Sequence, residues 1–185
     1  MLFLLIGILT LCVSASMADD DPFKGMLTYG EGQYKVGRDF IAGEYVLLNT
    51  SNYSGYFAIT KDANGKDIYA NDLFETNSII TVQDGEYLEL SNCIAIDAVG
   101  FYGSYTIKTE NNTGVMLKVG YGYGYDIQPG EYKVTAAKSG RSGYYCIYNN
   151  SRHKDIVAND LFSTSAYVEV RAGQYLILSN CYLNK

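Results

Sequence analysis

Residues 55–93 read GYFAITKDANGKDIYANDLFETNSIITVQDGEYLELSNC, and residues 143–181 read GYYCIYNNSRHKDIVANDLFSTSAYVEVRAGQYLILSNC. The two stretches align without a gap and are identical at 20 of 39 positions. The match extends upstream, where DFIAGEYVL at 39–47 lies over DIQPGEYKV at 126–134. Self-similarity at a fixed period is the signature of a repeated structural unit. The chain therefore contains two copies of one unit, and each position can be compared with its counterpart.

The two copies keep apolar residues at every second position of four segments. Tyr45 and Leu47 stay apolar in the second copy, whereas Val46 between them is replaced by Lys133. The same alternation runs through YFAI, IITV and YLEL. A period of two is typical of strands with one buried and one exposed face, so position 46 is expected to face outward. The predicted fold class is all-β: two tandem small antiparallel modules, each a sandwich or barrel, after a signal peptide.

The word ANDLF occurs in both copies, at 70–74 and 158–162. Asn and Asp side chains bond their own backbone in Asx-turns, so we expect a turn after a strand, with the Leu-Phe pair entering the core. A second interpretation is that the Asn-Asp pairs bind a cation or a sugar hydroxyl. The residues concerned are Asn71, Asp72, Asn159 and Asp160.

The N-terminal sequence predicts export. Residues 2–13 form an apolar run, and Ser16-Met17-Ala18 resembles a secretory cleavage site. A retained anchor is the rival interpretation, because no Lys or Arg precedes the run. The expected location is secreted or cell envelope. The expected segments are a signal peptide at 1–18, an N-terminal extension at 19–30, β module 1 at 31–108, a connector at 109–114 and β module 2 at 115–185.

Composition limits the classes of partner. The net charge is −6 and the pI is about 4.7. Phosphate backbones are bound by clustered Lys and Arg, and the sequence has no such cluster. Nucleic acid and anionic membranes are therefore not expected as partners, and no segment is expected to span a membrane after signal removal.

Tyrosine is abundant, with 19 residues, and its arrangement suggests a binding surface. In VGYGYGYDIQPGEY, Tyr121, Tyr123 and Tyr125 alternate with Gly and would project from one face of a strand. Tyrosines that we expect to be exposed elsewhere are Tyr53, Tyr56, Tyr144 and Tyr148. Such rings could stack on sugars or anchor a protein partner. Alternatively, they cover a Gly-rich strand.

The three cysteines after the signal segment are an odd number, which excludes a fully paired disulfide framework. Residues alternate between the two faces of a strand, and Leu88 and Leu90 are expected to point inward. Continuing the alternation from them puts Cys93 and Cys181 on the outer face, and the same alternation puts Cys146 there too. A Cys146–Cys181 bridge is conceivable, but we expect free thiols.

Metal binding and catalysis have little support. DANGKD at 62–67 predicts a hairpin with an Asn-Gly type I′ turn, and its oxygen donors resemble a calcium loop. The second copy reads NSRHKD and replaces two of those donors. His153 is the sole histidine, in a turn where copy 1 has Gly65, and no Ser-His-Asp set or His/Cys cluster is evident. We expect no metal, no cofactor and no enzymatic activity.

The string YKVGRDFIAGEYVL…GYFAIT…YANDLF…SIITVQDGEYLEL resembles a repeat in uncharacterised exported or cell-envelope β proteins of Gram-positive bacteria. That repeat runs roughly as VG-DIPAGEYVL, ND-F and YVTV-DGQYLEL. The first copy has IAG in place of PAG, and the second inserts YGYG after VG. The resemblance implies location and β-architecture, and no established activity.

The leading functional hypothesis is an exported, non-enzymatic binding or surface-interaction protein with a protein or glycan partner at the cell surface. The predicted binding residues are Tyr121, Tyr123, Tyr125, Tyr144, Tyr56, Asn71, Asp72, Asn159 and Asp160. One alternative is a structural envelope spacer or self-assembling subunit. A less favoured one is a glycan-active hydrolase with a pair of acids.

Overall fold

The computed structural model describes residues 22–109, 113–138 and 140–184, and it confirms the all-β prediction. The predicted signal peptide lies outside the described residues. Module 1 contains β1 (Thr28–Tyr29), β2 (Gly32–Lys35), β3 (Gly43–Asn49), β4 (Gly55–Thr60), β5 (Ile68–Phe74), β6 (Asn77–Val82), β7 (Tyr87–Ser91) and β8 (Cys93–Asp97). After a short helix, α1 (Ala98–Tyr102), module 2 contains β9 (Val115–Lys118), β10 (Gly130–Ala136), β11 (Gly143–Tyr148), β12 (Ile156–Phe162), β13 (Ser165–Val170), β14 (Tyr175–Ser179) and β15 (Cys181–Leu183).

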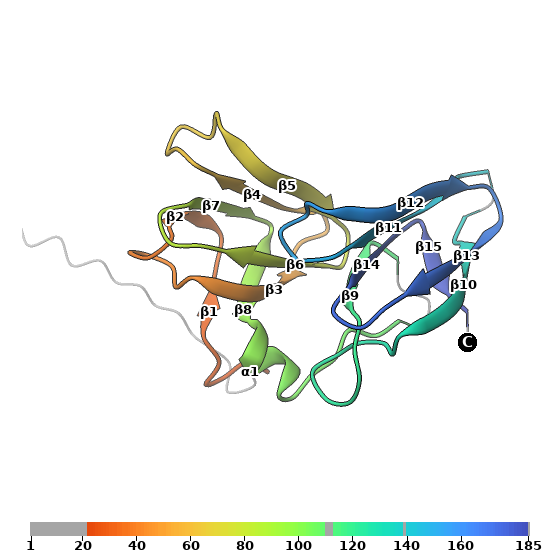
Figure 1. Cartoon of the computed structure of the whole chain (residues 1–185). Helices are drawn as coiled ribbons and strands as arrows, with labels where there is room; N and C mark the ends of the chain where they lie inside the picture. Colours follow the sequence, from red (N-terminus) through yellow and green to blue (C-terminus); the bar gives the residue numbers. More distant parts are fainter. Residues whose placement is uncertain (1–21, 110–112, 139, 185) are drawn as a thin grey trace, which may run out of the picture.

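The two modules repeat one strand topology. Module 1 consists of sheets β1-β8-β3-β6 and β2-β7-β4-β5, and module 2 of sheets β13-β10-β15 and β12-β11-β14-β9. Counterparts occupy the same places in the two modules, and the named strands pair antiparallel. Among the strands of the described residues, β1 lacks a counterpart; it pairs with β8 and lies in the segment expected to be an extension. Figure 1 shows the modules side by side.

Each module is a sandwich whose two sheets face each other across a core. In module 1 the core combines Leu47 and Ile80 of one sheet with Phe57, Ile59 and Leu88 of the other. These are the positions that alternation assigned to the interior.

The repeated word ANDLF is part of a strand, and the prediction of an Asx-turn after a strand is wrong. It forms most of β5 and β12, which are edge strands. An edge strand leaves backbone groups without a strand partner, and Asp72 Oδ1 accepts a hydrogen bond of 2.8 Å from the next N–H, that of Leu73. Asp160 does the same for Leu161. Both leucines are exposed, against expectation.

The phenylalanine of ANDLF fills the core as expected, against a glycine of the neighbouring strand. Phe74 is 5% exposed, and a Cβ on Gly55 would lie 2.5 Å from its ring. Gly143 stands in the same relation to Phe162. The phenylalanine of the repeated word is therefore scaffold in both copies, because its aromatic ring needs a residue without a side chain opposite.

Substituting Gly55 by Ala is expected to destabilise the protein by about 1–3 kcal/mol, because the added methyl group overpacks the Phe74 ring. Urea unfolding measures the loss. Gly30→Ala is the matched control, since a Cβ there meets nothing within 4 Å. Adding Phe74→Leu to Gly55→Ala should recover part of the stability, and equal stability of the two glycine variants would contradict the packing argument.

The cysteines are free, but two of them lie on the opposite face from the one expected. Cys93 and Cys181 are 0% exposed in their module cores. Asn92 and Asn180 have positive φ angles of 55° and 49°, so the chain kinks between the two strands and counting from Leu88 fails. Burial raises the pKa of both thiols to about 11. Cys146 is also free and buried.

The modules dock through the outer face of the sheet β1-β8-β3-β6. Val46, Ile79 and Ile96 point away from the module 1 core, yet all three are 0% exposed. They join one apolar cluster with Phe101 of α1, Met116 of β9 and the module 2 core. Position 46 faces outward from its own sandwich, as expected, and the other module and α1 cover it.

A hairpin loop of module 2, residues 149–155 between β11 and β12, also contacts module 1. Its Ser151 hydroxyl lies 2.7 Å from the Thr81 hydroxyl, and Arg152 pairs with Glu86 at 2.5 Å. The counterpart loop in module 1, residues 61–67, is a hairpin connection as expected. Only Gly65 of its Asn-Gly pair has a positive φ, so the turn is not type I′. The Asp62 carboxylate caps that loop by accepting from Asn64 N–H at 2.9 Å.

Candidate functional site

The docked modules enclose a cleft of about 520 Å³, here called the intermodule cleft. One wall is the edge of module 1 at β5, which contributes Asn71 and Asp72. The other wall is the outer face of module 2, with Tyr144 and Tyr148 of β11, and the loop residue His153 also lines the cleft. The volume is in the usual range for small-ligand sites.

His153 reaches across the interface. Its side chain is 4% exposed, and its ring packs on Phe57 of module 1 and Tyr148 of module 2, at centroid distances of 4.9 and 5.4 Å. Burial lowers the pKa of His153 to about 4, against the opposing effect of a hydrogen bond to the Ile79 carbonyl. The imidazole is therefore neutral at physiological pH.

Docking brings together Ser78, His153 and Asp72, a set that sequence analysis did not find. Nε2 of His153 lies 3.1 Å from the carbonyl oxygen of Ile79 and 3.3 Å from Ser78 Oγ. A carbonyl only accepts hydrogen bonds, so Nε2 carries the proton and Nδ1 carries the lone pair. In a Ser-His-Asp triad, Nε2 must instead accept the serine proton. Ser78 is also 1% exposed. The set therefore differs from a nucleophilic triad in two ways: Nε2 carries a proton, and a substrate cannot reach the Ser78 hydroxyl.

The Asp72 carboxylate lies at the opening of the cleft. Its side chain is 38% exposed, and Oδ2 lies 3.9 Å from His153 Nδ1, beyond hydrogen-bond distance. Burial raises the pKa of Asp72, and the hydrogen bond from Leu73 N–H opposes that rise. Within the described part of the chain, the basic group that lies beside Asp72 is this neutral histidine. A carboxylate oxygen and an imidazole nitrogen without a proton therefore lie near each other in the cleft.

Three of the nine predicted binding residues line this cleft: Asn71, Asp72 and Tyr144. Asn159 lies next to it, since its amide donates to the Tyr144 hydroxyl at 3.3 Å. Tyr56 and Asp160 are not among the lining residues.

Tyr121, Tyr123 and Tyr125 lie away from the intermodule cleft, and the strand expected for them is wrong. Residues 120–126 form a loop in which Gly122 and Gly124 have φ angles of 79° and 87°. Tyr121 and Tyr123 are exposed, whereas Tyr125 folds back over Gly120. The three rings therefore do not share one face. The YGYG insertion is this loop, and β9 before it is unaffected.

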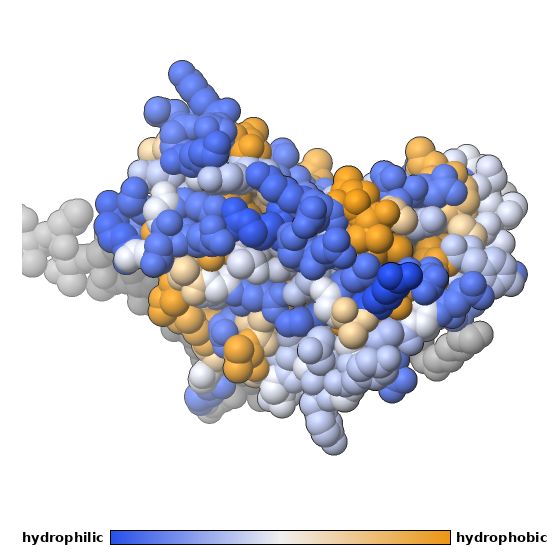
Figure 2. Space-filling model, in the orientation of Figure 1, coloured by the Kyte–Doolittle hydropathy of each residue, from blue (hydrophilic) through white to orange (hydrophobic). Residues whose placement is uncertain are grey.

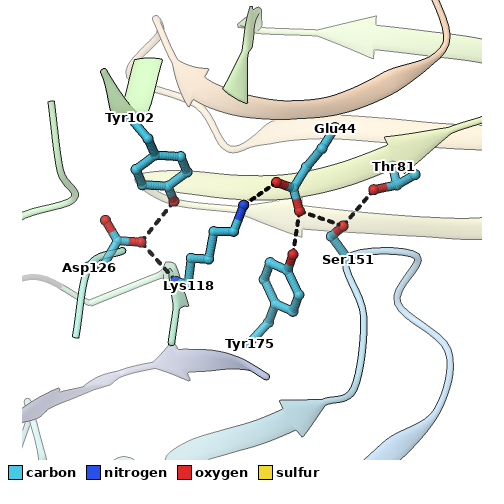
Figure 3. Close-up of polar contacts among 7 residues, drawn as sticks. All are labelled: Glu44, Thr81, Tyr102, Lys118, Asp126, Ser151 and Tyr175. Atoms are coloured by element: carbon cyan, nitrogen blue, oxygen red, sulfur yellow. Dashed lines mark hydrogen bonds and ion pairs between the residues drawn. The ribbon is translucent and has the colours of Figure 1, made fainter. Parts of the chain in front are cut away.

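A polar network fixes the modules relative to each other, and Figure 3 shows its members. The Glu44 carboxylate of module 1 accepts hydrogen bonds from Lys118, Tyr175 and Ser151 of module 2. Tyr175 has a raised pKa because it is buried and donates to Glu44.

Asp126 forms the second centre of the network. It accepts from the Tyr102 hydroxyl of α1 at 2.8 Å, from Lys118 N–H at 2.8 Å and from Ile107 N–H at 2.6 Å. Burial raises the pKa of Asp126 against these hydrogen bonds. Its counterpart Asp39 is exposed beside Arg38, whose hydrogen bond lowers the pKa of Asp39 to about 2.

Comparison of the chain with protein-family models, with curated proteins and with solved structures finds no match. Within residues 22–109, 113–138 and 140–184, no three His, Cys, Asp or Glu side chains are grouped to hold a metal ion. The same ranges contain no helix with the length and hydrophobicity needed to cross a bilayer.

Acid is expected to weaken the folded protein through His153. The folded pKa is about 4 and the ordinary value 6.5, so between these values the unfolded chain binds the proton more readily. Stability is lost as the pH falls from 6.5 to 4, by about 3 kcal/mol for this group. Urea midpoints from pH 7 to 4 measure the slope. His153→Gln keeps a donor for the Ile79 carbonyl and should give a flatter profile; parallel profiles would refute the assignment.

Proposed function

We propose that this chain is an exported, non-catalytic binding protein whose two β modules form one ligand site, the intermodule cleft. The observation that carries the proposal is that the cleft takes its walls from both modules and holds two hydrogen-bond acceptors, Asp72 Oδ2 and His153 Nδ1, 3.9 Å apart. Two tyrosine rings beside them, Tyr144 and Tyr148, offer apolar and polar contacts at once. The partner is a molecule of the cell surface or its surroundings.

The absence of catalysis in this proposal rests on the histidine tautomer. Nε2–H donates to the Ile79 carbonyl, so the ring is not a base toward Ser78. Release of a product from a bound probe, abolished by Ser78→Ala, would contradict this part of the proposal.

The binding proposal is tested by NMR titration of the labelled protein with aliphatic amines, amino acids, monosaccharides and disaccharides. At least one probe class should shift resonances of residues lining the intermodule cleft. Tyr144→Ala should weaken that binding at least tenfold, and Tyr121→Ala, in the exposed loop, should leave it unchanged. If no probe shifts the cleft resonances, and a glycan array and envelope pull-downs are also blank, the proposal fails.

Export is the cellular part of the proposal and has its own test. The sequence Ser16-Met17-Ala18 supports cleavage before Asp19. N-terminal sequencing of the protein from culture medium or envelope should begin at Asp19, and a chain that keeps residues 1–18 there would favour the anchor instead.

Self-association is the second candidate function, and the edge strand β12 favours it. Ile156, Val157 and Leu161 are 55%, 48% and 68% exposed, and Figure 2 shows apolar surface over this part of module 2. Within the described residues β12 pairs with β11 alone, so its other edge is available to a strand of a second copy. Light scattering over a wide concentration range decides this, because a strict monomer would rule out assembly.

A further inference from the structure

We propose that the intermodule cleft binds a primary ammonium group, held between the Asp72 carboxylate and His153 Nδ1, on an aliphatic amine. This inference rests on the proposed function and gives it a ligand class. It begins from two hydrogen-bond acceptors of the cleft, Asp72 Oδ2 and His153 Nδ1, which lie 3.9 Å apart.

The spacing of the two acceptors fits one nitrogen with several donors. Asp72 Oδ2 and His153 Nδ1 are 3.9 Å apart. If a nitrogen lies about 2.8 Å from each of them, the angle acceptor–nitrogen–acceptor is about 90°. A primary ammonium carries three N–H groups and can donate to both acceptors at once. A single hydroxyl has one proton, so it satisfies Asp72 or His153 and leaves the other without a donor.

The charge of the residues that line the cleft favours a cationic ligand over a neutral ligand that binds through hydroxyl groups. Among the described residues that line the cleft, Asp72 and Glu75 are acidic and none is Lys or Arg. His153 is neutral, since burial lowers its pKa to about 4. A partly buried carboxylate without a cation costs free energy, and a bound ammonium would remove that cost.

The rings beside the acceptors suit the rest of such a ligand. Tyr144 and Tyr148 line the cleft on the module 2 side, and tyrosine rings attract cations and pack against alkyl chains. The Tyr69 ring differs, because Lys61 and Lys154 already lie 4.9 and 4.4 Å from its centroid. Tyr69 is three residues from Asp72, about 10 Å along the strand, so we place the ammonium at the Asp72 end.

The second copy provides an internal control. Asp160 is the counterpart of Asp72 and makes the same bond to the following N–H. The counterpart of His153 is Gly65, so module 2 has no imidazole acceptor from a partner loop. The ammonium site therefore exists once, where the loop 149–155 meets β5.

The test is an NMR titration of the full mature chain with 1,5-diaminopentane, 1,5-pentanediol and methyl glucoside at pH 7. The diamine should shift cleft resonances and bind at least tenfold more tightly than the diol of equal length. Asp72→Asn should weaken diamine binding at least tenfold, while Asp160→Asn leaves it unchanged. Urea midpoints of both variants confirm that they are folded. Nα-acetyl-lysine amide, compared with the free diamine, distinguishes a lysine side chain from a small amine as the source.

The outcomes separate this inference from the proposed function. Diol or glucoside binding in the cleft as tight as that of the diamine would overturn the ammonium site and leave the binding role intact. Diamine binding that Asp72→Asn does not weaken would also overturn the site. Failure of every probe class at the cleft would count against both.

Discussion

Replacing Val46 by lysine is expected to cost the folded protein at least about 4 kcal/mol, because it buries a charge without a partner. The side chain is 0% exposed and packs in the cluster that joins the modules. Lysine is compatible with the strand itself, since Lys133 occupies the equivalent position of β10, where it is exposed. The loss would therefore come from docking and not from the sandwich.

The measurement is urea unfolding followed by circular dichroism. The wild type should unfold in one transition, whereas Val46→Lys should unfold at lower urea and in two, because each module then unfolds separately. The reciprocal change, Lys133→Val, is the matched control and should alter stability by less than about 0.5 kcal/mol. A small effect of Val46→Lys, equal to that of its control, would show that the interface does not hold the modules together.

Removing the Glu44 carboxylate is the second large change. Glu44→Ala would leave Lys118, Tyr175 and Ser151 without their acceptor. Breaking a partly buried ion pair by deleting one partner costs about 3 kcal/mol, since the remaining charge stays desolvated. Both side chains are about one fifth exposed, at 22% and 21%, so the effect is expected at the lower end of the range for buried pairs.

Urea unfolding again measures the change, and Glu131→Ala supplies the control. Glu131 is the same residue of the same GEY motif in module 2, but it is exposed, so its removal should cost less than about 0.5 kcal/mol. The double variant Glu44→Leu with Lys118→Met removes both charges and should recover much of the stability. If it is as unstable as Glu44→Ala, the loss does not arise from the unpaired lysine.

Much of the fold could be predicted because it depends on local patterns. Alternation between the copies correctly identified the inward faces, as at Leu47 and Ile80, since each strand must bury one face in any module. It failed where the backbone changes direction, as at Asn92, because parity holds only within an uninterrupted strand. It also could not separate outward residues that meet solvent from those that meet the other module. Val46 and Lys133 differ in sequence for that reason.

The candidate site was only partly predictable. The repeated Asn-Asp pair and the abundance of tyrosine point to Asn71, Asp72 and Tyr144, and all three line the intermodule cleft. The sequence alone indicates only a turn at His153, since its position beside Asp72 depends on how two separate modules dock. The available signal was that NSRHKD replaces DANGKD inside an otherwise well-kept hairpin. Where a loop differs between the two copies while the flanking strands are alike, the loop of one copy can have a contact that the other copy lacks.

The unlike outer faces of the two modules also determine whether stacking can continue. Module 1 offers Val46 and Ile79 to its neighbour, but the corresponding face of module 2 presents Lys133 and the exposed Tyr167. If the outer face of module 2 could dock onto a further module in the way that module 1 docks onto module 2, units would add head to tail without limit and form a filament. Because the corresponding face of module 2 carries a lysine and an exposed tyrosine, it is unsuited to docking a third module. Assembly through this face therefore stops at two modules.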